Sequence, residues 1–192
     1  IAERQIAEQT GRGIVCYVSN TSWLDGSSHP AMRERFLTAF DKVWIDNLHG
    51  DSRRTGKLTP DGDSDPSAFS TPSNREGIQV GTAVALMART DAQQEGGEAE
   101  VEYRDFWGAS KLQTLAALAD VGPLAGLGVA GPGYEPLVPQ APLGLPLLPR
   151  LTAENYLDWP TIPEIMPAYF PGVFTARDAA LVDIDRDSLQ AR

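Results

Sequence analysis

Residues 13–24 read GIVCYVSNTSWL, and this stretch decides the fold that the sequence predicts. Its first part, Ile14 to Val18, is a continuous apolar run rich in β-branched and aromatic residues, which is typical of a parallel strand buried on both faces of a sheet. A polar stretch from Ser19 to Ser28 follows, and Pro30 suits the first turn of a helix. We therefore predict a central strand that leads through a polar loop into a helix.

The chain after Pro30 completes a strand-helix-strand unit. The apolar residues of the expected helix share one face: Met32, Phe36, Leu37 and Phe40. Residues 42–48, KVWIDNL, have the composition of the next strand. Such a unit, here over residues 14–48, is the building block of an α/β sheet.

The same patterns predict the remaining elements of the first 120 residues. We expect a helix over residues 1–10, strands over 78–87 and 101–106, a turn over 93–99 and a helix over 111–119. Gly81 and Thr82 suggest a close backbone approach or a bulge in their strand. Residues 49–76 are rich in Asp, Ser, Gly, Pro and Thr, and they form a loop whose length is typical of functional loops.

Composition divides the chain into three parts. Residues 1–120 form the α/β domain, and residues 121–150 carry so many prolines that we expect no regular element there, only a linker or a wrapping segment. Residues 151–192 begin a second unit with a short helix or turn, a turn at Gly172 and a strand over 180–184. Because the sequence starts at Ile1 and stops within a plausible helix, we expect a segment of a longer chain.

The overall composition excludes several classes of protein. The 192 residues contain no apolar window long enough to span a membrane and no signal peptide, so we expect a cytoplasmic protein without a membrane partner. Two histidines and the single Cys16 are too few for a soft-metal cluster, and we predict no structural metal. The net charge of −10 argues against strong nucleic-acid binding by this segment alone.

Three partial matches to known motifs fail in their context. GLGVAG at 126–131 fits a dinucleotide fingerprint, but no strand precedes it and Pro132 follows where a helix should begin. GDSRRTGKLT at 50–59 resembles a phosphate-binding loop, but it lacks the first Gly and the final Ser or Thr. The carboxylates of Asp61, Asp63 and Asp65 lack the Glu that a calcium loop requires, so we interpret their segment as a solvated loop.

Polar residues at the end of the first strand form the first candidate site. Asn20, Thr21 and Ser22 lie at the carboxyl end of the expected strand, where open α/β sheets place their ligands, and Trp23 follows them. Two interpretations are open at this point. Either these residues line a binding cleft, or Asn20 caps a turn and Trp23 fills the core.

Four strings resemble the later half of the catalytic domain of adenine-specific DNA methyltransferases. They are GIVCYVSNTSWLDG, MRERFLTAFDKVWIDNLHGD, DPSAFST and NREGIQVGTAVALMAR. They are most similar to the large single-chain restriction-modification enzymes of the Type ISP kind, in which a helicase-type motor precedes the methyltransferase and a target-recognition domain follows it. NYLDWPTIPEIMP and GVFTARDAALVDID resemble the junction where that recognition domain starts. The resemblance covers most of the chain except residues 121–150.

The resemblance implies a specific fold. Residues 1–120 would form the C-terminal half of a Rossmann-like methyltransferase sheet, and residues 151–192 the start of the target-recognition domain. Strands 14–18, 42–48 and 78–87 would be the fifth, sixth and seventh strands of that sheet. The last of them would run antiparallel between the other two.

The resemblance also implies a site for a flipped adenine in DNA. Phe69 resembles the aromatic position that stacks on the flipped base, because base flipping needs such a wall. The residues expected around the same cleft are Asn20, Trp23, Gln79 and Thr82, and for the last two the interior of a strand is the alternative. Arg53, Arg54 and Lys57 form a basic stretch that could contact DNA phosphates, or that is solvated and neutralised by nearby aspartates.

The chain lacks the motifs that carry the chemistry in this family. A Gly-rich loop for S-adenosylmethionine and an Asn-Pro-Pro-Tyr or Asp-Pro-Pro-Tyr tetrapeptide are both absent, and the nearest string is Asp65-Pro66-Ser67-Ala68. We expect both motifs before Ile1 in the parent enzyme. No catalytic and no cofactor-binding residue is therefore assigned to this chain.

The function predicted from the sequence is part of a DNA adenine-N6 methyltransferase of a restriction-modification system. The parent would transfer a methyl group from S-adenosylmethionine to adenine in double-stranded DNA, and this segment alone would be inactive. Its partners would be DNA, a helicase and nuclease portion upstream and a recognition domain downstream. The alternatives are a non-catalytic interaction or scaffold module and a degenerate DNA-recognition segment.

Overall fold

The structure is a computed structural model that describes residues 1–90, 97–120, 133–166, 168, 187 and 190. It separates into two units, Ile1–Leu151 and Thr152–Arg192, which are described here one at a time. The first unit, called unit 1 below, contains the sheet and the long loop. Its elements follow the strand-helix-strand order that the sequence predicts.

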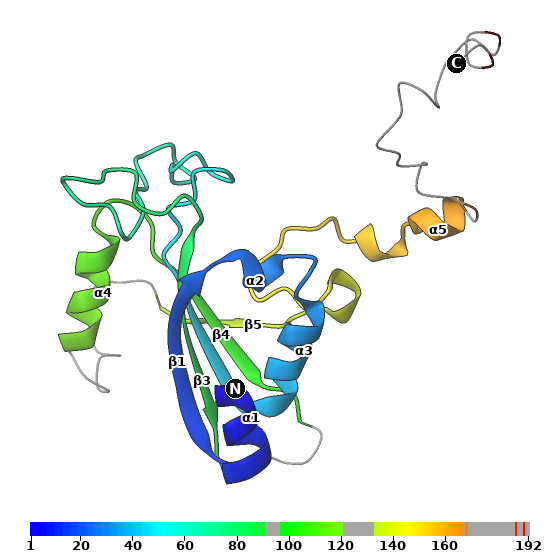
Figure 1. Cartoon of the computed structure of the whole chain (residues 1–192), viewed down its shortest axis with the longest axis horizontal. Coiled ribbons are helices and arrows are strands. Elements are labelled where there is room, and N and C mark those ends of the chain that lie inside the picture. The colour runs from blue at the N-terminus through cyan, green and yellow to red at the C-terminus, as the bar shows by residue number, and fades with distance from the viewer. Residues whose placement is uncertain (91–96, 121–132, 167, 169–186, 188–189, 191–192) are drawn as a thin grey trace. The chain divides into compact units, whose positions relative to one another are not determined.

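Five strands form one mixed sheet in unit 1 (Figure 1). They are β1 (Gly13–Asn20), β2 (Lys42–Asn47), β3 (Thr82–Arg89), β4 (Glu100–Asp105) and β5 (Glu135–Leu137), in the order β1-β3-β2-β4-β5. β3 pairs antiparallel with both β1 and β2, whereas β2 and β4 are parallel. The predicted antiparallel strand between two others is therefore confirmed.

The position of β1 corrects the prediction of a central strand buried on both faces. Among the described strands β1 lies at one end of the sheet, and its side chains alternate between half-buried and exposed. Tyr17 faces the core and stacks at a tilt on Trp23, whereas Ile14 and Val18 are exposed on the other face. An apolar run cannot distinguish one covered face from two, because the residue types suit both.

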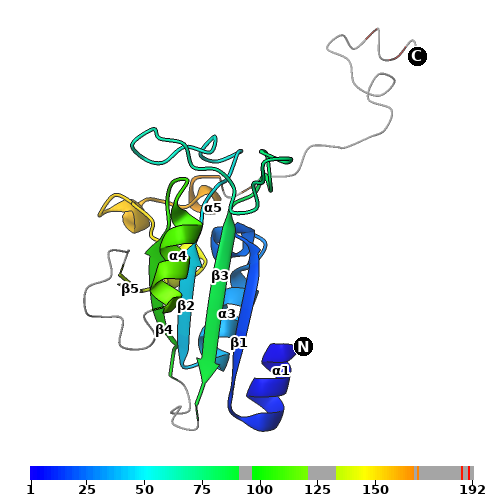
Figure 2. The ribbon, with the colours of Figure 1, turned by 90° about the vertical axis from the view of Figure 1, so that its left-hand side faces the viewer.

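Helices lie on both sides of the sheet (Figure 2). α3 (Pro30–Ala39) begins at Pro30 as predicted and buries Leu37 against the sheet, while α4 (Lys111–Asp120) lies on the opposite side. The chain starts with α1 (Ala2–Arg4), which continues as a π-helix over Gln5–Thr10 and ends at Gly11 in the left-handed conformation. α2 (Ser22–Asp25) is a single turn between β1 and α3.

β3 begins four residues later than the sequence suggests. Residues 78–81 are held outside the ladder because the Gly81 amide donates to the Asp51 carboxylate and the Ser52 amide donates to the Gln79 carbonyl oxygen. Gly81 also confirms the predicted close approach. A Cβ atom there would lie 2.9 Å from the Thr21 hydroxyl oxygen.

Residues 133–150 correct the expectation that the proline-rich segment has no regular element. β5 adds a fifth strand there, and a 3-10 helix follows over Ala141–Leu143. Pro136 is tolerated because β5 is the outer strand on its side of the described sheet. Leu147 is fully buried, and its amide donates to the Leu24 carbonyl oxygen at 2.7 Å. Residues 121–132 lie outside the described part of the chain.

The second unit is described over a short stretch. It contains a 3-10 turn at Tyr156–Asp158 and α5 (Ile162–Ile165), in agreement with the short helix or turn predicted there. Thr161 and Glu164 cap the N-terminus of α5 with a capping box. The predicted turn at Gly172, the predicted strand over 180–184 and most of the turn over 93–99 lie outside the described residues.

Candidate functional site

A cavity of about 290 Å³ opens at the end of the sheet where β1, β2 and β4 finish and β3 begins. We call it the edge pocket. The residues that line it include Thr21, Asn47, His49, Gly81, Asp105 and Trp107. Asn47 and Asp105 are the last residues of two parallel strands and are register partners, so the topology brings their side chains to one place. Open α/β sheets bind ligands at this edge.

A chain of hydrogen bonds organises the floor of the edge pocket. The Asn47 amide donates to the Tyr103 hydroxyl oxygen at 2.7 Å, and the Tyr103 hydroxyl donates to Oδ1 of Asp105 at 2.5 Å. Nε2 of His49 contacts the same oxygen at 2.5 Å. Burial raises the pKa of Tyr103, and the charge and hydrogen bond of Asp105 act in the same direction. The phenol therefore stays protonated and donates to the carboxylate.

Two aromatic rings form one wall of the pocket. The rings of His49 and Trp107 stack with centroids 3.3 Å apart and an angle of 12° between their planes. His49 has a φ of 46°, and its amide donates to Oδ1 of Asn47, which holds the residue in this unusual conformation. Sequence reasoning missed both residues. The signal available was that each closely follows one of two parallel strands.

Asp51 fixes the beginning of the long loop. Its Oδ1 accepts from the amides of Arg53 and Arg54 at 2.7 and 2.8 Å, and its Oδ2 accepts from Gly81 at 3.1 Å. Burial opposes ionisation of this carboxyl, but the backbone donors of Arg54, Gly81 and Arg53 outweigh it and lower the pKa of Asp51. The carboxylate thus joins the two ends of the loop.

Asp65 corrects the interpretation of the acidic segment as simply solvated. Its side chain is completely buried and accepts from the amides of Gly50 and Gly108 at 2.7 and 2.8 Å. It also pairs with the buried ammonium of Lys111 at 2.5 Å, and Lys111 donates to the Leu48 carbonyl oxygen. The middle of the loop is therefore anchored to the start of α4, whereas Asp61 and Asp63 are exposed.

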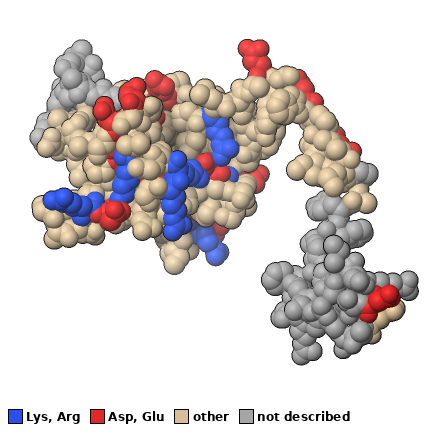
Figure 3. Space-filling view, turned by 90° about the horizontal axis from the view of Figure 1, so that it is seen from above, with Lys and Arg blue, Asp and Glu red and all other residues tan. Residues whose placement is uncertain are grey.

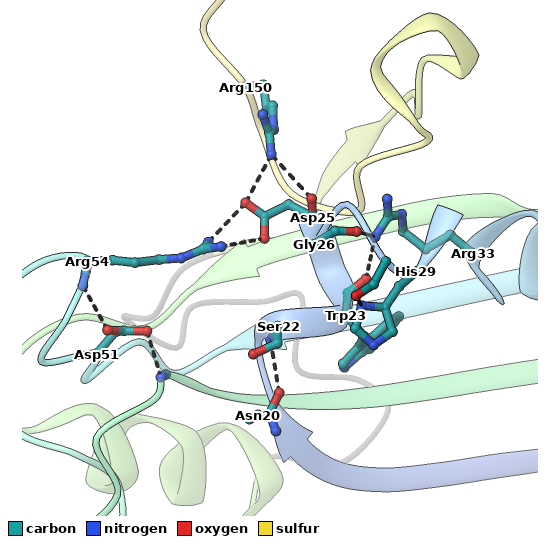
Figure 4. A network of polar contacts seen from close by, with 12 residues as sticks. Asn20, Ser22, Trp23, Asp25, Gly26, His29, Arg33, Asp51, Arg54 and Arg150 are labelled. Atoms are coloured by element: carbon teal, nitrogen blue, oxygen red, sulfur yellow. Dashed lines mark hydrogen bonds and ion pairs between the residues drawn. The ribbon is translucent and has the colours of Figure 1, made fainter. Parts of the chain in front are cut away.

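Arginines gather around Asp25 at the mouth of the edge pocket (Figure 4). Arg54 binds the Asp25 carboxylate through two hydrogen bonds of 2.9 Å, and Arg150 donates to the same carboxylate at 3.1 Å. Figure 4 also shows the Arg33 guanidinium close by, where it donates to carbonyl oxygens and not to a carboxylate. Arg54 lines the pocket, and Arg150 follows Pro149, which also lines it.

The structure places the residues that the sequence grouped into one cleft in different environments, although Asn20 and Thr82 are neighbours in the sheet. Asn20 is exposed, and its side chain accepts from the Ser22 amide, as in the turn-capping interpretation. Trp23 is only 6% exposed and packs in the core, which corrects its assignment to a pocket wall. Thr82 is buried as the strand partner of Asn20, in line with the strand-interior alternative. Gln79 is exposed in the segment before β3.

Phe69 lies in a turn of the long loop with its side chain exposed. Its side chain is 49% exposed, which is unusual for a large aromatic residue. The Ser67 hydroxyl accepts from the amides of Phe69 and Ile78, so the serine ties the two sides of the turn together. Phe69 does not line the edge pocket.

The three predicted DNA-contacting cations differ in their surroundings. Arg54 is paired with Asp25, and Lys57 is paired with Glu76 at 2.9 Å. The Arg53 side chain is exposed and makes no ion pair with any described residue. Figure 3 views the loop end from above and shows Lys and Arg side chains interspersed with Asp and Glu. Arg54 is thus neutralised by an aspartate, as in the alternative interpretation of the basic stretch, while contact with DNA phosphates stays a prediction.

Within the described residues, no group of three or more His, Cys, Asp or Glu side chains could hold a metal ion. The helices in that same part of the chain are all too short or too polar to cross a membrane.

Comparison with known proteins identifies structures of the same fold. The sequence matches no protein-family model and no curated protein. The structure resembles a nuclease-deletion mutant of the Type ISP restriction-modification enzyme LlaGI in complex with a DNA substrate mimic, with a TM-score of 0.53 and 22% identity over 78% of this chain. It also resembles a chain of the DrdV-DNA complex, with a TM-score of 0.50 and 21% identity over 81% of this chain. This chain spans only 12% and 13% of the lengths of those two chains.

Proposed function

We propose that this chain is a DNA-facing segment of an adenine-N6 DNA methyltransferase that belongs to a restriction-modification system. The observation that carries the proposal is the placement of β3, which runs antiparallel between β1 and β2. This is the order of the last three strands in a Rossmann-like methyltransferase sheet. The long loop between β2 and β3 then lies at the sheet edge where ligands bind.

The shared fold with LlaGI supports this proposal, because that Type ISP enzyme was captured with a DNA substrate mimic. In the proposed parent enzyme, Phe69 stacks on the adenine that leaves the duplex. Its side chain is already exposed, and its turn is fixed by Ser67, so little ordering remains to be done when a base arrives.

The buried ion pair of Asp65 and Lys111 anchors the loop that carries the Phe69 turn. The buried ion pair joins the loop to α4 two residues before Ser67, and three further hydrogen bonds hold it. A rigid base for an exposed aromatic side chain suits a stacking role, because stacking gains most when the ring is held in place before binding. Among the three predicted cations, Arg53 is the best placed for a DNA phosphate, since its side chain is exposed and makes no ion pair with a described residue.

Our proposal places no S-adenosylmethionine site in this chain. The sequence lacks the Gly-rich loop that the family uses for this cofactor, and β1 corresponds in the proposal to the fifth strand of the sheet and not to the strand that precedes such a loop. We therefore assign to this chain the recognition and orientation of the DNA base. The cofactor and the acceptor of the adenine amino group belong to other parts of the proposed parent.

Substitution of Phe69 tests the proposal in the parent enzyme. We expect Phe69→Ala to lower the rate of adenine methylation in duplex DNA about 5-fold to 100-fold, because base stacking contributes about 1–3 kcal/mol. Overall DNA affinity should change much less, since phosphate contacts dominate it. The two quantities are measured by methyl transfer from labelled cofactor and by equilibrium DNA binding.

Leu58→Ala is the matched control for this experiment. Leu58 is exposed to 47% in the same loop but carries no proposed role. Its substitution should leave methylation unchanged. Equal methylation rates for Phe69→Ala and the unsubstituted enzyme would contradict the stacking role, and absence of any methylation by the unsubstituted parent would contradict the proposed function itself.

A further inference from the structure

We propose that the edge pocket binds a second deoxynucleotide, whose base carries an exocyclic amine and whose phosphate lies on Arg54 and Arg150. The inference rests on the proposed function, because the nucleotide comes from the same DNA strand that presents a base to Phe69. It concerns a different place in the fold, since Phe69 does not line this pocket. At about 290 Å³ the pocket has room for one nucleotide.

The aromatic wall gives the base a surface. His49 and Trp107 are already stacked on each other at 3.3 Å, so the wall is rigid before a ligand arrives. Flat bases bind against aromatic side chains without regard to sequence, because every base has a π face. This wall therefore explains affinity for a base but no preference among bases.

Asp105 supplies the preference. Its Oδ1 accepts from Tyr103 and contacts Nε2 of His49, whereas no described residue donates to its Oδ2. The side chain is 37% exposed and lines the pocket. A fixed carboxylate oxygen accepts hydrogen bonds from base amines, such as N6 of adenine and N4 of cytosine. Thymine has no exocyclic amine, and its ring N3–H donor lies between two carbonyl oxygens that repel the carboxylate.

The arginines at the mouth supply the contact for the phosphate. Arg54 and Arg150 share the carboxylate of Asp25, while Asp51 also acts on Arg54 and the buried Arg33 acts on Arg150. Taken together, the three arginines and two aspartates carry one positive charge in excess. Both guanidinium groups are about half exposed, at 52% and 43%, and each has five donors of which Asp25 occupies only some. Guanidinium groups match phosphate oxygens in geometry and charge. A nucleotide with its base on Asp105 can therefore place its phosphate at this rim.

The experiment uses the 192-residue chain and four ligands. Indole N–H resonances are followed by NMR during titration with dAMP, dCMP, dTMP and the uncharged deoxyadenosine, and a Trp107→Phe variant assigns the Trp107 signal. We expect dAMP and dCMP to shift that signal and saturate. We expect dTMP and deoxyadenosine to bind about tenfold more weakly, for lack of an amine and of a phosphate respectively.

Three variants test the assigned contacts. Asp105→Asn should bring the affinities for dAMP and dTMP together, and Arg150→Ala should bring those for dAMP and deoxyadenosine together. Arg75→Ala is the matched control, because Arg75 is an exposed cation of the same loop that does not line the pocket and has no proposed role in DNA binding. It should leave all four affinities unchanged. An unaltered Trp23 indole signal reports that each variant is folded.

Several results would overturn the proposal. They are the absence of any Trp107 shift up to about 10 mM dAMP, equal affinities for dAMP and dTMP, and a loss of binding in Arg75→Ala as large as that in Arg150→Ala. A deoxyadenosine trinucleotide should bind more tightly than dAMP, and equal binding would assign the pocket to free nucleotides in place of DNA. If the pocket fails while Phe69→Ala still impairs methylation, the proposed function stands without the second site.

Discussion

Arg33 is the residue whose substitution tests our account of how unit 1 is held together. Arg33 is only 1% exposed, and among the described residues its guanidinium donates to carbonyl oxygens and to no carboxylate. Nη1 donates to the carbonyl oxygens of Trp23 and Gly26 at 2.8 and 2.9 Å. Nε and Nη2 both donate to the carbonyl oxygen of Gly144, at 3.0 and 2.6 Å. One side chain of α3 thus joins α2 to the segment after β5.

The expected cost of losing this group follows from those contacts. Arg33→Met keeps most of the apolar stem but leaves the carbonyl oxygens of Trp23 and Gly144 without this donor. Each buried acceptor left unpaired costs about 1–3 kcal/mol. Removal of a buried charge relieves part of this cost, since burial disfavours the ion and lowers the pKa of Arg33. We expect a net loss of about 3 kcal/mol in the free energy of unfolding.

Urea denaturation of the full chain, followed by circular dichroism, measures this loss. With a slope of about 1–3 kcal/mol per molar urea, the midpoint should fall by about 1–3 M. Arg35→Met is the matched control, because Arg35 lies on the same helix, is 48% exposed and pairs only with Glu3 and Glu8. It should cost less than about 1 kcal/mol. Equal losses for the two variants would refute the argument that Arg33 acts through buried acceptors.

Two further predictions concern the long loop. Lys111→Met should lower the free energy of unfolding by about 3–5 kcal/mol, because it leaves the Asp65 charge buried without an ionic partner. Adding Asp65→Asn to this variant should recover part of that loss in the same urea assay. Additive losses for the two substitutions would contradict the pairing. Asp51→Asn should destabilise the fold at pH 7. Backbone donors lower the pKa of Asp51 in the folded state, so its ionised form stabilises the fold at pH values above the unfolded pKa of about 3.9. That contribution is lost as the pH falls through the folded pKa, so the difference in the free energy of unfolding between variant and wild type should shrink below about pH 4. A difference that does not change with pH would count against this role.

The sequence predicted the elements whose signals are local. Pro30 marked the start of α3, and the apolar runs located β1, β2 and β4 to within two residues. β5 was missed because two of the features that usually exclude a strand, a proline and a short length, are both acceptable in an outer strand. Periodicity also could not show which faces of β1 are covered, since that depends on neighbours far along the chain.

The candidate site was harder to predict than the fold, because it depends on which strand ends meet. His49 and Trp107 are 58 residues apart and come together only through the parallel register of β2 and β4. Asp65 stood among similar acidic residues, and nothing local distinguished it from its exposed neighbour Asp63. Trp23, by contrast, had two open interpretations, and the structure places it within the short helix α2 with its side chain in the core.

The bond from Arg33 to Gly144 has a consequence for the order in which the chain folds. The two residues are separated by 111 positions, and Leu147 reaches the core through the same segment. A nascent chain that has not yet extended past residue 147 holds an α3 whose central cation lacks one of its acceptors and a core that lacks a side chain. Synthesis proceeds from the N-terminus, so the final packing of the sheet and α3 waits for residues that emerge about a hundred positions later.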